Sequence, residues 1–415
     1  MDERYEKAVE LLKKNNQEHI IKVLENSTEE QKNKLLEQIM YIDFNQMKEL
    51  YESTQKEISF DKDVIEPIDY IDKEKLTDEE LNKYNNIGEN VIKNGKYAVV
   101  TMAGGQGTRL GHKGPKGTFM MGLEEDKSIF QILIESIKEK NEKYGVVIPW
   151  YIMTSRENNE QTQNFFKENN YFGYDSNSII FFKQGELPMC DEQGKILVDE
   201  TGVIKEAADG HGGIFISMQR NGIIDDMKKR GIEWVFIGGV DNILAKMVDE
   251  TLVGILEDKH ILAAGKSVVK ANPQEKVGVF CKRNGKPGVV EYTEITNEMA
   301  ERLNENGELA FGESHLNCNM FNIKALEIIG NKKLPYHAAH KKANYINENG
   351  EVVVATAPNA YKFEAFIFDA FDMLDDMVIF RVKREDEFAP VKNAEGNDSP
   401  ETARNLYINF HKNNK

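Results

Sequence analysis

Apolar positions along the chain follow two different spacings, and the change between them falls near residue 96. Up to residue 95 apolar side chains recur at helical spacing, and residues 27–30 and 77–80 both fit the capping-box pattern, in which Ser or Thr precedes Glu by three positions. Gly95 follows the second predicted helix and can adopt the left-handed conformation that ends a helix. We therefore expect residues 1–95 to form an amino-terminal helical region.

From residue 97 the apolar positions gather into short runs, with helical patterns at 129–143 and 222–231 between several of them. The runs are "YAVVTM", "IPWYIMTS", "IIFFKQ", "WVFIGGVD", "ILAAGKSVVK", "VGVFCK", "GVVEYTEI" and "VVVATAP". Strands that alternate with helices predict an α/β core on a mixed, mainly parallel sheet, and "RNGKPG" and "NENG" predict added hairpins. We expect this core to span residues 96–374, followed by a short carboxyl-terminal lobe at 375–415. In that lobe, "DDMVIFRVKREDEF" predicts a strand with solvated flanks.

Composition narrows the class of protein. The chain has 415 residues, 40% of them hydrophobic, and a formal net charge of −17, which disfavours binding to nucleic acid. No apolar run approaches the ~20 residues of a membrane span, and the first residues lack the apolar stretch of a signal peptide. Three cysteines far apart, without CxxC spacing, argue against a disulfide framework or structural zinc site. We expect a cytoplasmic protein that does not bind membranes.

The stretch "TMAGGQGTRLGHKGPKGTF", residues 101–119, is unusual in so acidic a chain, because it combines six glycines with one arginine and two lysines. A strand that continues into glycines exposes consecutive backbone N–H groups, which form an anion cradle, and Arg109 and Lys116 can direct charge at phosphate oxygens. The spacing fits neither the P-loop nor the G-x-G-x-x-G dinucleotide fingerprint, since the glycines are spaced G-x-G-x-x-x-G. A nucleotide phosphate loop is the favoured interpretation, and a tight turn with incidental surface cations is the alternative.

Asp241 follows the apolar run "WVFIGGV" and should lie at the carboxyl end of a strand, where open α/β sheets place their ligands. A carboxylate there can hold Mg²⁺ while phosphates and waters complete the octahedron. Asp241 could also cap a helix beginning with "NILAKMVDE", and Asn242 is a weaker candidate ligand. His337 and His340, spaced i, i+3, lack a third ligand and are interpreted as structural.

The loop contains "AGGQGTRLG" followed by "PKG", and eight further motifs come after it in order. Together these nine resemble the eukaryotic-type UDP-sugar pyrophosphorylases, most closely those that act on N-acetylglucosamine. The eight are "QGELPMCDEQGKIL", "AADGHGGIF", "GGVDNILAK", "GVVEYTEI", "NCNMF", "LPYHAAHKK", "KFEAFIFDAF" and "FAPVKNAEG…DSPETAR". The resemblance implies a Rossmann-like fold of the nucleotidyltransferase type. It also implies Mg²⁺-dependent transfer of a uridylyl group from UTP to a sugar 1-phosphate, with release of pyrophosphate.

The resemblance also implies roles for individual residues. Arg109, Lys116 and Lys392 match the cations of catalysis, Lys392 being the one that binds the attacking sugar phosphate. Residues that match the nucleotide site are Met102, Ala103, Gly104, Gly105, Gln184, Gly210, Asp241 and Lys362, with Gln184 reading the uracil edge. Residues that match the sugar site are His211, Glu291, Tyr292 and Asn319. Phe366 and Phe368 could line a pocket for an acetyl methyl group, although core packing is the simpler interpretation.

The chain departs from the family pattern at His211, where the acetylglucosamine enzymes usually have asparagine. The triplet "GHG" is closer to the UDP-glucose enzymes, so a UDP-glucose or UDP-hexose pyrophosphorylase remains the alternative. A non-catalytic nucleotide-sugar sensor is disfavoured because it would not need Arg109, Lys116, Asp241 and Lys392 together. An NAD-dependent oxidoreductase is disfavoured by the glycine spacing. Family members usually continue beyond the "PETAR" region into a further β-rich domain, whereas this chain stops about a dozen residues after it. Because dimer contacts made by that domain would be missing, we also expect a monomer.

Overall fold

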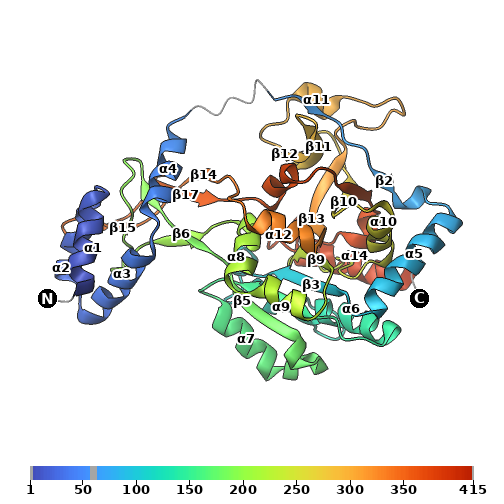
Figure 1. Cartoon of the computed structure of the whole chain (residues 1–415), viewed down its shortest axis with the longest axis horizontal. Coiled ribbons are helices and arrows are strands. Elements are labelled where there is room, and N and C mark those ends of the chain that lie inside the picture. The colour runs from blue at the N-terminus through green and yellow to red at the C-terminus, as the bar shows by residue number, and fades with distance from the viewer. Residues whose placement is uncertain (1–2, 57–62, 414–415) are drawn as a thin grey trace. The chain divides into compact units, whose positions relative to one another are not determined.

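The computed structural model describes residues 3–56 and 63–413, and the chain divides into two compact units (Figure 1). The first unit comprises Met1–Lys62, Gly185–Gly213 and Leu334–Phe366, and the second comprises Asp63–Gln184, Ile214–Lys333 and Ile367–Lys415. These units differ from the expected limits at 95/96 and 374/375. The difference arises because the segments after residue 62 and after residue 375 supply strands to the main sheet of the second unit.

The first unit combines four amino-terminal helices with small antiparallel sheets. The helices are α1 (Glu3–Lys14), α2 (His19–Asn26), α3 (Glu29–Tyr41) and α4 (Phe44–Thr54). One sheet has the order β14 (His337–Lys341), β17 (Ala360–Glu364), β7 (Cys190–Asp191), and the others are the pairs β15 (Tyr345–Ile346) with β16 (Val352–Val353) and β6 (Glu186–Pro188) with β8 (Glu206–Ala208). The predicted capping box of α3 is displaced by one residue, since Thr28 caps the helix and Gln31 closes the box.

The second unit is built on one large sheet with the strand order β2–β18–β10–β13–β9–β3–β4–β5. Its strands are β2 (Ile71–Asp72), β18 (Val378–Arg381), β10 (Ala263–Val269), β13 (Glu313–Asn322), β9 (Trp234–Gly239), β3 (Tyr97–Met102), β4 (Trp150–Thr154) and β5 (Ile179–Lys183). All neighbours along this order are parallel except those of β13, which runs antiparallel to β9 and β10. A hairpin of β11 (Val279–Arg283) and β12 (Lys286–Val290), with β1 (Ile65–Glu66), branches from this sheet. The predicted mixed, mainly parallel sheet is therefore confirmed.

Helices of the second unit cover this sheet (Figure 1). They include α5 (Asp78–Lys93), α6 (Ile129–Tyr144), α7 (Asn159–Glu168), α8 (Ile214–Arg220), α9 (Ile223–Lys229), α10 (Glu250–Lys259), α12 (Ile323–Gly330) and α14 (Pro400–Asn413). The predicted capping box of α5 is present between Thr77 and Glu80, and Gly95 beyond its end has φ of 68°. No helix within the described residues is long and apolar enough to cross a membrane.

Two predictions about local structure are wrong. Residues 241–249 do not form a helix, because α10 begins only at Glu250 and takes its cap from Asp249, whose side chain accepts from the Leu252 amide. Asp241 is therefore no helix cap. The charged run around β18 is not simply solvated, since Arg381 and Glu387 are buried in ion pairs with Glu313 and with Lys266.

Candidate active site

The carboxyl ends of β3, β4, β5 and β9 meet at one edge of the main sheet, as they must in parallel strands. The amide of Gln184 donates to the carbonyl of Thr154 at 2.8 Å, and the amide of Val240 donates to the carbonyl of Met102 at 3.1 Å. The segments that leave these strands carry the predicted phosphate loop, Gln184 and Asp241. The topology thus brings predicted residues that are more than a hundred positions apart to a single edge.

The loop after β3 is closed by hydrogen bonds within its own backbone. The amide of Lys116 donates to the carbonyl of Gly105 at 3.0 Å, and the amide of Gly107 donates to the carbonyl of Gly114 at 2.9 Å. Within the part of the chain that the structure describes, the amides of residues 104–106 make no hydrogen bond to another protein group. Three consecutive N–H groups without a protein acceptor are what an anion cradle requires.

Asn158, just before α7, anchors this loop and was not identified from the sequence. It is fully buried, and its Nδ2 donates to the carbonyls of Ala103 at 3.0 Å and Gly105 at 3.4 Å. Its own orientation is fixed by a reciprocal pair of bonds with Ser155, whose amide donates to Asn158 Oδ1 at 2.9 Å and whose Oγ accepts from the Asn158 amide at 3.1 Å. Asn158 stands at the cap position of α7, and only the preference for asparagine at such positions could have drawn attention to it.

Gln184 lies directly against the loop. A Cβ atom added to Gly104 would come within 2.3 Å of Gln184 Oε1, so the close approach of the amide depends on the absence of a side chain at residue 104. At Gly105, by contrast, an added Cβ would meet nothing within 4 Å. The structure thus places a donor–acceptor side chain next to the cradle and leaves open space beyond it.

The two cations of the loop are accessible. Arg109 lies in a short 3₁₀ turn, residues Thr108–Leu110, and is exposed, while Lys116 begins a second such turn and is half-buried. Gly111 between them has φ of 70°, in the left-handed region that favours glycine. No carboxylate in the described chain lies within 4.0 Å of either cation as an ion-pair partner. Both charges are therefore available to an anion.

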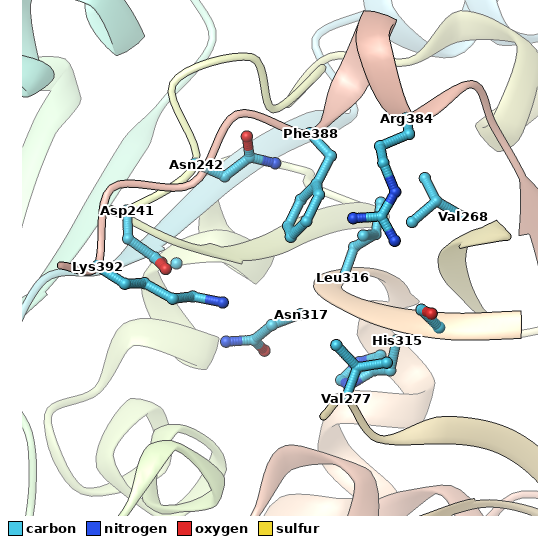
Figure 2. A pocket seen from close by; sticks show the side chains of 12 residues that line it. Asp241, Asn242, Val268, Val277, His315, Leu316, Asn317, Arg384, Phe388 and Lys392 are labelled. Atoms are coloured by element: carbon cyan, nitrogen blue, oxygen red, sulfur yellow. The ribbon is translucent and has the colours of Figure 1, made fainter. Parts of the chain in front are cut away.

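A cavity of about 140 Å³ lies beside the end of β9 (Figure 2). The side chains of Asp241, Lys392 and Asn317 converge on one part of it, while Arg384 and Phe388 approach from another part. Its full lining is Gly239, Asp241, Asn242, Val268, Val277, Ser314, His315, Leu316, Asn317, Arg384, Phe388 and Lys392. Asp241 is held against Gly239, where an added Cβ would lie 2.5 Å from Asp241 Oδ1.

Asn317 was missed by the sequence, which singled out Asn319 instead. In β13, Asn319 pairs with Ile237 of β9, so it lies below the edge and is fully buried, with its Oδ1 3.2 Å from His315 Nε2. Asn317 lies two residues nearer to the edge, has φ of 53° and lines the cavity. The left-handed conformation, which asparagine tolerates better than most residues, is not visible in a sequence. The register of β13 against β9 thus places Asn317 at the cavity and Asn319 deeper within the sheet.

Asn242 is not free to act as a metal ligand. Its Oδ1 accepts from the amides of Ala389 at 2.9 Å and Leu244 at 3.3 Å, and its Nδ2 donates to the carbonyl of Glu387 at 2.8 Å. The side chain is buried. The Asn242 side chain therefore holds the backbone of Glu387 and Ala389, in the segment that leads to Lys392.

The predicted sugar residues Glu291 and Tyr292 follow β12. The Glu291 carboxylate lies close to Gly278, where an added Cβ would be 3.1 Å from Glu291 Oε1, and the Gly278 carbonyl accepts from the amide of His315 at 2.9 Å. Glu291 is thus linked through one residue to the wall of the cavity. Tyr292 is 46% exposed and lines no part of it.

Three predicted site residues, Gly210, His211 and Lys362, belong to the first unit. Gly210 has φ of 86°, and an added Cβ would lie 2.3 Å from the carbonyl oxygen of Ala365, so any other residue would be strained. Lys362 in β17 forms an ion pair with Glu364 at 2.6 Å.

The ring of His211 lies 5.4 Å from that of Phe366, which stacks at 4.8 Å on His337. His337 and His340 belong to β14, and no group of three or more potential metal ligands occurs among the described residues. Phe368 lies in the second unit, with its ring 6.0 Å from that of His315. The two phenylalanines thus contact different histidines.

The three cysteines are buried and free. Burial raises the pKa of the Cys318 thiol to about 12 and that of Cys281 to about 11. Thiols with such high pKa values are poor nucleophiles, so the candidate chemistry of this site rests on cations, amides and one carboxylate.

The mixed, mainly parallel α/β sheet, with a glycine-rich loop at its carboxyl edge and a carboxylate at the end of the adjacent strand, is a fold of the nucleotidyltransferase type. The family model described as UTP–glucose-1-phosphate uridylyltransferase matches residues 41–408. The chain belongs to this family, and it is a uridylyltransferase by that membership.

Relatives with established names agree with this assignment. The chain is 37% identical to UDP-N-acetylglucosamine diphosphorylase 2 of Arabidopsis thaliana over 98% of its length and 84% of the relative's. It is 38% identical to the UDP-N-acetylglucosamine pyrophosphorylase of Saccharomyces cerevisiae over 79% of its length and 71% of the relative's. The crystal structure of the uridine diphosphate N-acetylglucosamine pyrophosphorylase from Trypanosoma brucei superposes with a TM-score of 0.85 and 30% identity, covering 100% of this chain and 86% of that one. The resemblance expected from the motifs is confirmed.

Proposed function

We propose that the protein transfers a uridylyl group from UTP to N-acetylglucosamine 1-phosphate and releases pyrophosphate. The convergence of Asp241 and Lys392 at the sheet edge that also carries the phosphate loop is the observation that carries the reaction. The choice of sugar is supported by the names of the relatives, which are those of N-acetylglucosamine enzymes.

The reaction requires that two anions approach each other while charge develops on the transferring phosphoryl group. Such chemistry depends on positioning and on cations more than on a general base. The free amides of residues 104–106, with Arg109 and Lys116, are suited to the phosphates of UTP. Lys392 is suited to the sugar phosphate, whose oxygen attacks the α-phosphorus as pyrophosphate leaves in line.

Asp241 is the residue that we propose to hold Mg²⁺. Magnesium in such sites is bound by one or two carboxylates together with substrate phosphates and waters, so a single half-buried carboxylate at a strand end fits it without a larger acidic cluster. The ion, when bound, would neutralise phosphate charge. The backbone carbonyl of Asp241 accepts from the Val391 amide at 2.8 Å, which fixes the main chain from which this carboxylate projects.

Side-chain amides, a carboxylate and aromatic rings are the groups that we propose to contact the base and the sugar. Gln184 offers both a donor and an acceptor to a uracil edge, and we propose Gly210 and Lys362 as further nucleotide contacts. For the sugar, we propose contacts from His211, Glu291, Tyr292 and Asn319. The buried Asn319 Nδ2 has no partner among the described residues, so a donor is available there.

A pyrophosphate-release assay with UTP and a panel of sugar 1-phosphates tests this function. We expect release with N-acetylglucosamine 1-phosphate to exceed release with glucose 1-phosphate by at least about tenfold in kcat/KM, which corresponds to ~1.4 kcal/mol of transition-state discrimination. If none of the sugar 1-phosphates caused pyrophosphate release, uridylyl transfer would be contradicted.

A UDP-glucose or UDP-hexose pyrophosphorylase is the second candidate, and His211 is the observation that favours it. Its ring lies 5.4 Å from that of Phe366 in the first unit, and an imidazole at this position is the departure from the family pattern described above. A preference for glucose 1-phosphate in the same assay would select this candidate. Replacing His211 by Asn should then shift the preference towards the acetylated sugar.

The association state of the protein also stays a prediction. We expect a monomer, and light scattering on the purified chain, with and without UTP, measures its mass directly. A mass near 47.4 kDa agrees with a monomer, whereas twice that mass contradicts it.

A further inference from the structure

A short backbone pairing joins the segment that carries Asp241 to the segment that carries Lys392. The amide of Val391 donates to the carbonyl of Asp241 at 2.8 Å, and the amide of Ile243 donates to the carbonyl of Ala389 at 3.2 Å. Figure 2 shows the two segments next to each other above the cavity. The separation of the Asp241 carboxylate from the Lys392 ammonium therefore depends on how firmly these segments are held.

Asn242 and Glu387 hold the second segment at its start. The Asn242 amide group makes three hydrogen bonds to the backbone of residues 244, 387 and 389, as described above. Glu387 supplies one of those carbonyls, and its buried carboxylate lies 2.5 Å from Lys266 Nζ and 3.0 Å from Lys73 Nζ. The backbone contact and the ionic contact thus act on the same residue.

Lys266 joins both segments from inside the sheet. It lies in the middle of β10, is only 1% exposed, and forms a second ion pair with the buried Asp249 at 2.7 Å. Its Nζ also donates to the carbonyl of Lys246 at 3.2 Å, in the loop that begins at Asp241. One ammonium group therefore fixes the far end of the Asp241 loop and the near end of the Lys392 segment.

The charges of this cluster stay ionised. Burial alone would lower the pKa of Lys266, but Asp249 and Glu387 outweigh burial and raise that pKa above its ordinary value. Burial would likewise raise the pKa of the Glu387 carboxyl, whereas Lys266 lowers it. A buried pair of this kind is weak evidence for stability but a known means of fixing one arrangement of chain segments.

We propose that Lys266, Glu387 and Asn242 are positioning residues, which set the distance between Asp241 and Lys392 without touching substrate. The inference rests on the proposed function, since Asp241 and Lys392 are its reacting-site groups. A displacement of about 1 Å at a reacting group can cost on the order of a hundredfold in rate. The cluster therefore controls turnover, whereas UTP affinity is set elsewhere, at the loop of residues 104–116.

Two variants test the proposal, each milder than the loss of Lys266. Glu387→Gln keeps the shape of the side chain and removes its charge, and Asn242→Ala removes the three backbone hydrogen bonds while leaving every ion pair in place. The matched control is Glu313→Gln, which breaks another buried ion pair of the same sheet, to Arg381, and leaves the hydrogen bonds of Asn242 and the ion pairs of Glu387 in place. Either test variant suffices if the other fails to fold.

We expect kcat to fall about ten- to a hundredfold in both test variants, with the dissociation constant of UTP within about threefold of wild type. The control should lose thermal stability and keep kcat within about twofold. Equal kcat values in test and control variants would overturn the proposal, because a merely structural role moves stability alone.

Crystal structures of the variants separate this proposal from the proposed function. We expect the distance between Asp241 and Lys392 to change in Glu387→Gln and Asn242→Ala and to be unchanged in Glu313→Gln. If the wild-type protein makes no UDP-sugar, the proposed function fails, but this distance still decides the positioning role. An unchanged distance in both test variants would overturn it.

Discussion

Lys392 stands at the end of a backbone pairing and carries a charge that is little engaged by the protein. The carboxylate of Asp398 lies 3.8 Å from its Nζ, and both side chains are close to half exposed, at 44% and 39%. Exposed pairs of this kind contribute only about 0–1 kcal/mol. The ammonium group can therefore turn to a bound phosphate at little cost.

Replacing Lys392 by Met should lower kcat by about a hundred- to a thousandfold, because one preorganised cation at a reacting phosphate is removed. UTP affinity, measured by calorimetric titration, should change little. Lys383→Met is the matched control, since Lys383 is similarly exposed, at 46%, and pairs with Glu74 on the surface. A Lys392→Met enzyme with wild-type turnover would contradict the assigned role.

Replacing Gly104 by Ala should weaken UTP binding about tenfold while leaving stability nearly unchanged. The new Cβ would displace the amide of Gln184, which is the mobile end of a flexible side chain and can move away. Gly330→Ala serves as the control, because the nearest atoms to its added Cβ are at 3.6 Å, an ordinary contact. Wild-type UTP affinity in Gly104→Ala would argue against Gln184 as the uracil reader.

The phosphate loop keeps its shape because a second element holds it. Asn158 connects the start of α7 to the carbonyls of residues 103 and 105, and it does so from a fully buried position. A loop that must present free amides cannot use those amides to hold itself, so its carbonyls supply the anchorage instead.

Asn158→Ala should lower the free energy of unfolding by about 1–3 kcal/mol, because two carbonyl groups lose a buried donor. The KM for UTP should rise as the cradle loosens. Urea denaturation and steady-state kinetics measure the two effects. Asn169→Ala, which removes an exposed hydrogen bond to Phe165 O, should produce neither, and an equal rise in KM there would refute the anchoring role.

The strands and helices that carry the site were predictable because their signals are local. The apolar runs "YAVVTM", "IPWYIMTS", "IIFFKQ" and "WVFIGGVD" contain the four strands whose carboxyl ends meet at one edge of the sheet, and the Thr77 capping box starts α5 as expected. The helix expected after Asp241 is absent, since Asp249 rather than Asp241 offers the cap. Several acidic residues of this segment could cap a helix, and the sequence does not show which of them does.

Features that depend on distant partners escaped the sequence. The sequence around Glu387 and Arg381 predicts solvated charges, yet both side chains are buried. Each forms an ion pair with a residue of another strand, Glu387 with Lys266 and Arg381 with Glu313. The choice between Asn317 and Asn319 depends on how far β13 extends past the end of β9. Strand register of this kind is set by tertiary pairing and not by composition.

For the molecule as a whole, carboxylates that are buried beside lysines make the free energy of unfolding depend on pH. Glu250 is an informative example: burial alone would raise its pKa, but Lys246 and Lys140 lower it to about 2 from the ordinary 4.5. The Lys140 ammonium lies 3.0 Å from its carboxylate, of which only 10% is exposed. A carboxyl with a depressed pKa stabilises the fold above the unfolded pKa and loses that stabilisation as the pH falls through the folded one.

The free energy of unfolding should therefore fall between about pH 5 and pH 2, with Glu250 accounting for about 3 kcal/mol of the loss. In Glu250→Gln the protein should be less stable than wild type at pH 7, and the two should converge near pH 2. Urea denaturation across this range measures the difference. Glu30→Gln, which removes a fully exposed partner of Lys34, should run parallel to wild type, and a constant gap between Glu250→Gln and wild type would contradict the account.

The central claim is that bare amides of residues 104–106 and the cations around them hold the phosphates of UTP. A crystal structure of the protein soaked with UTP tests it most directly. We expect the triphosphate within hydrogen-bond distance of those amides and of Arg109 or Lys116, with the uracil edge facing Gln184. A nucleotide bound away from the loop that follows β3 would contradict the claim.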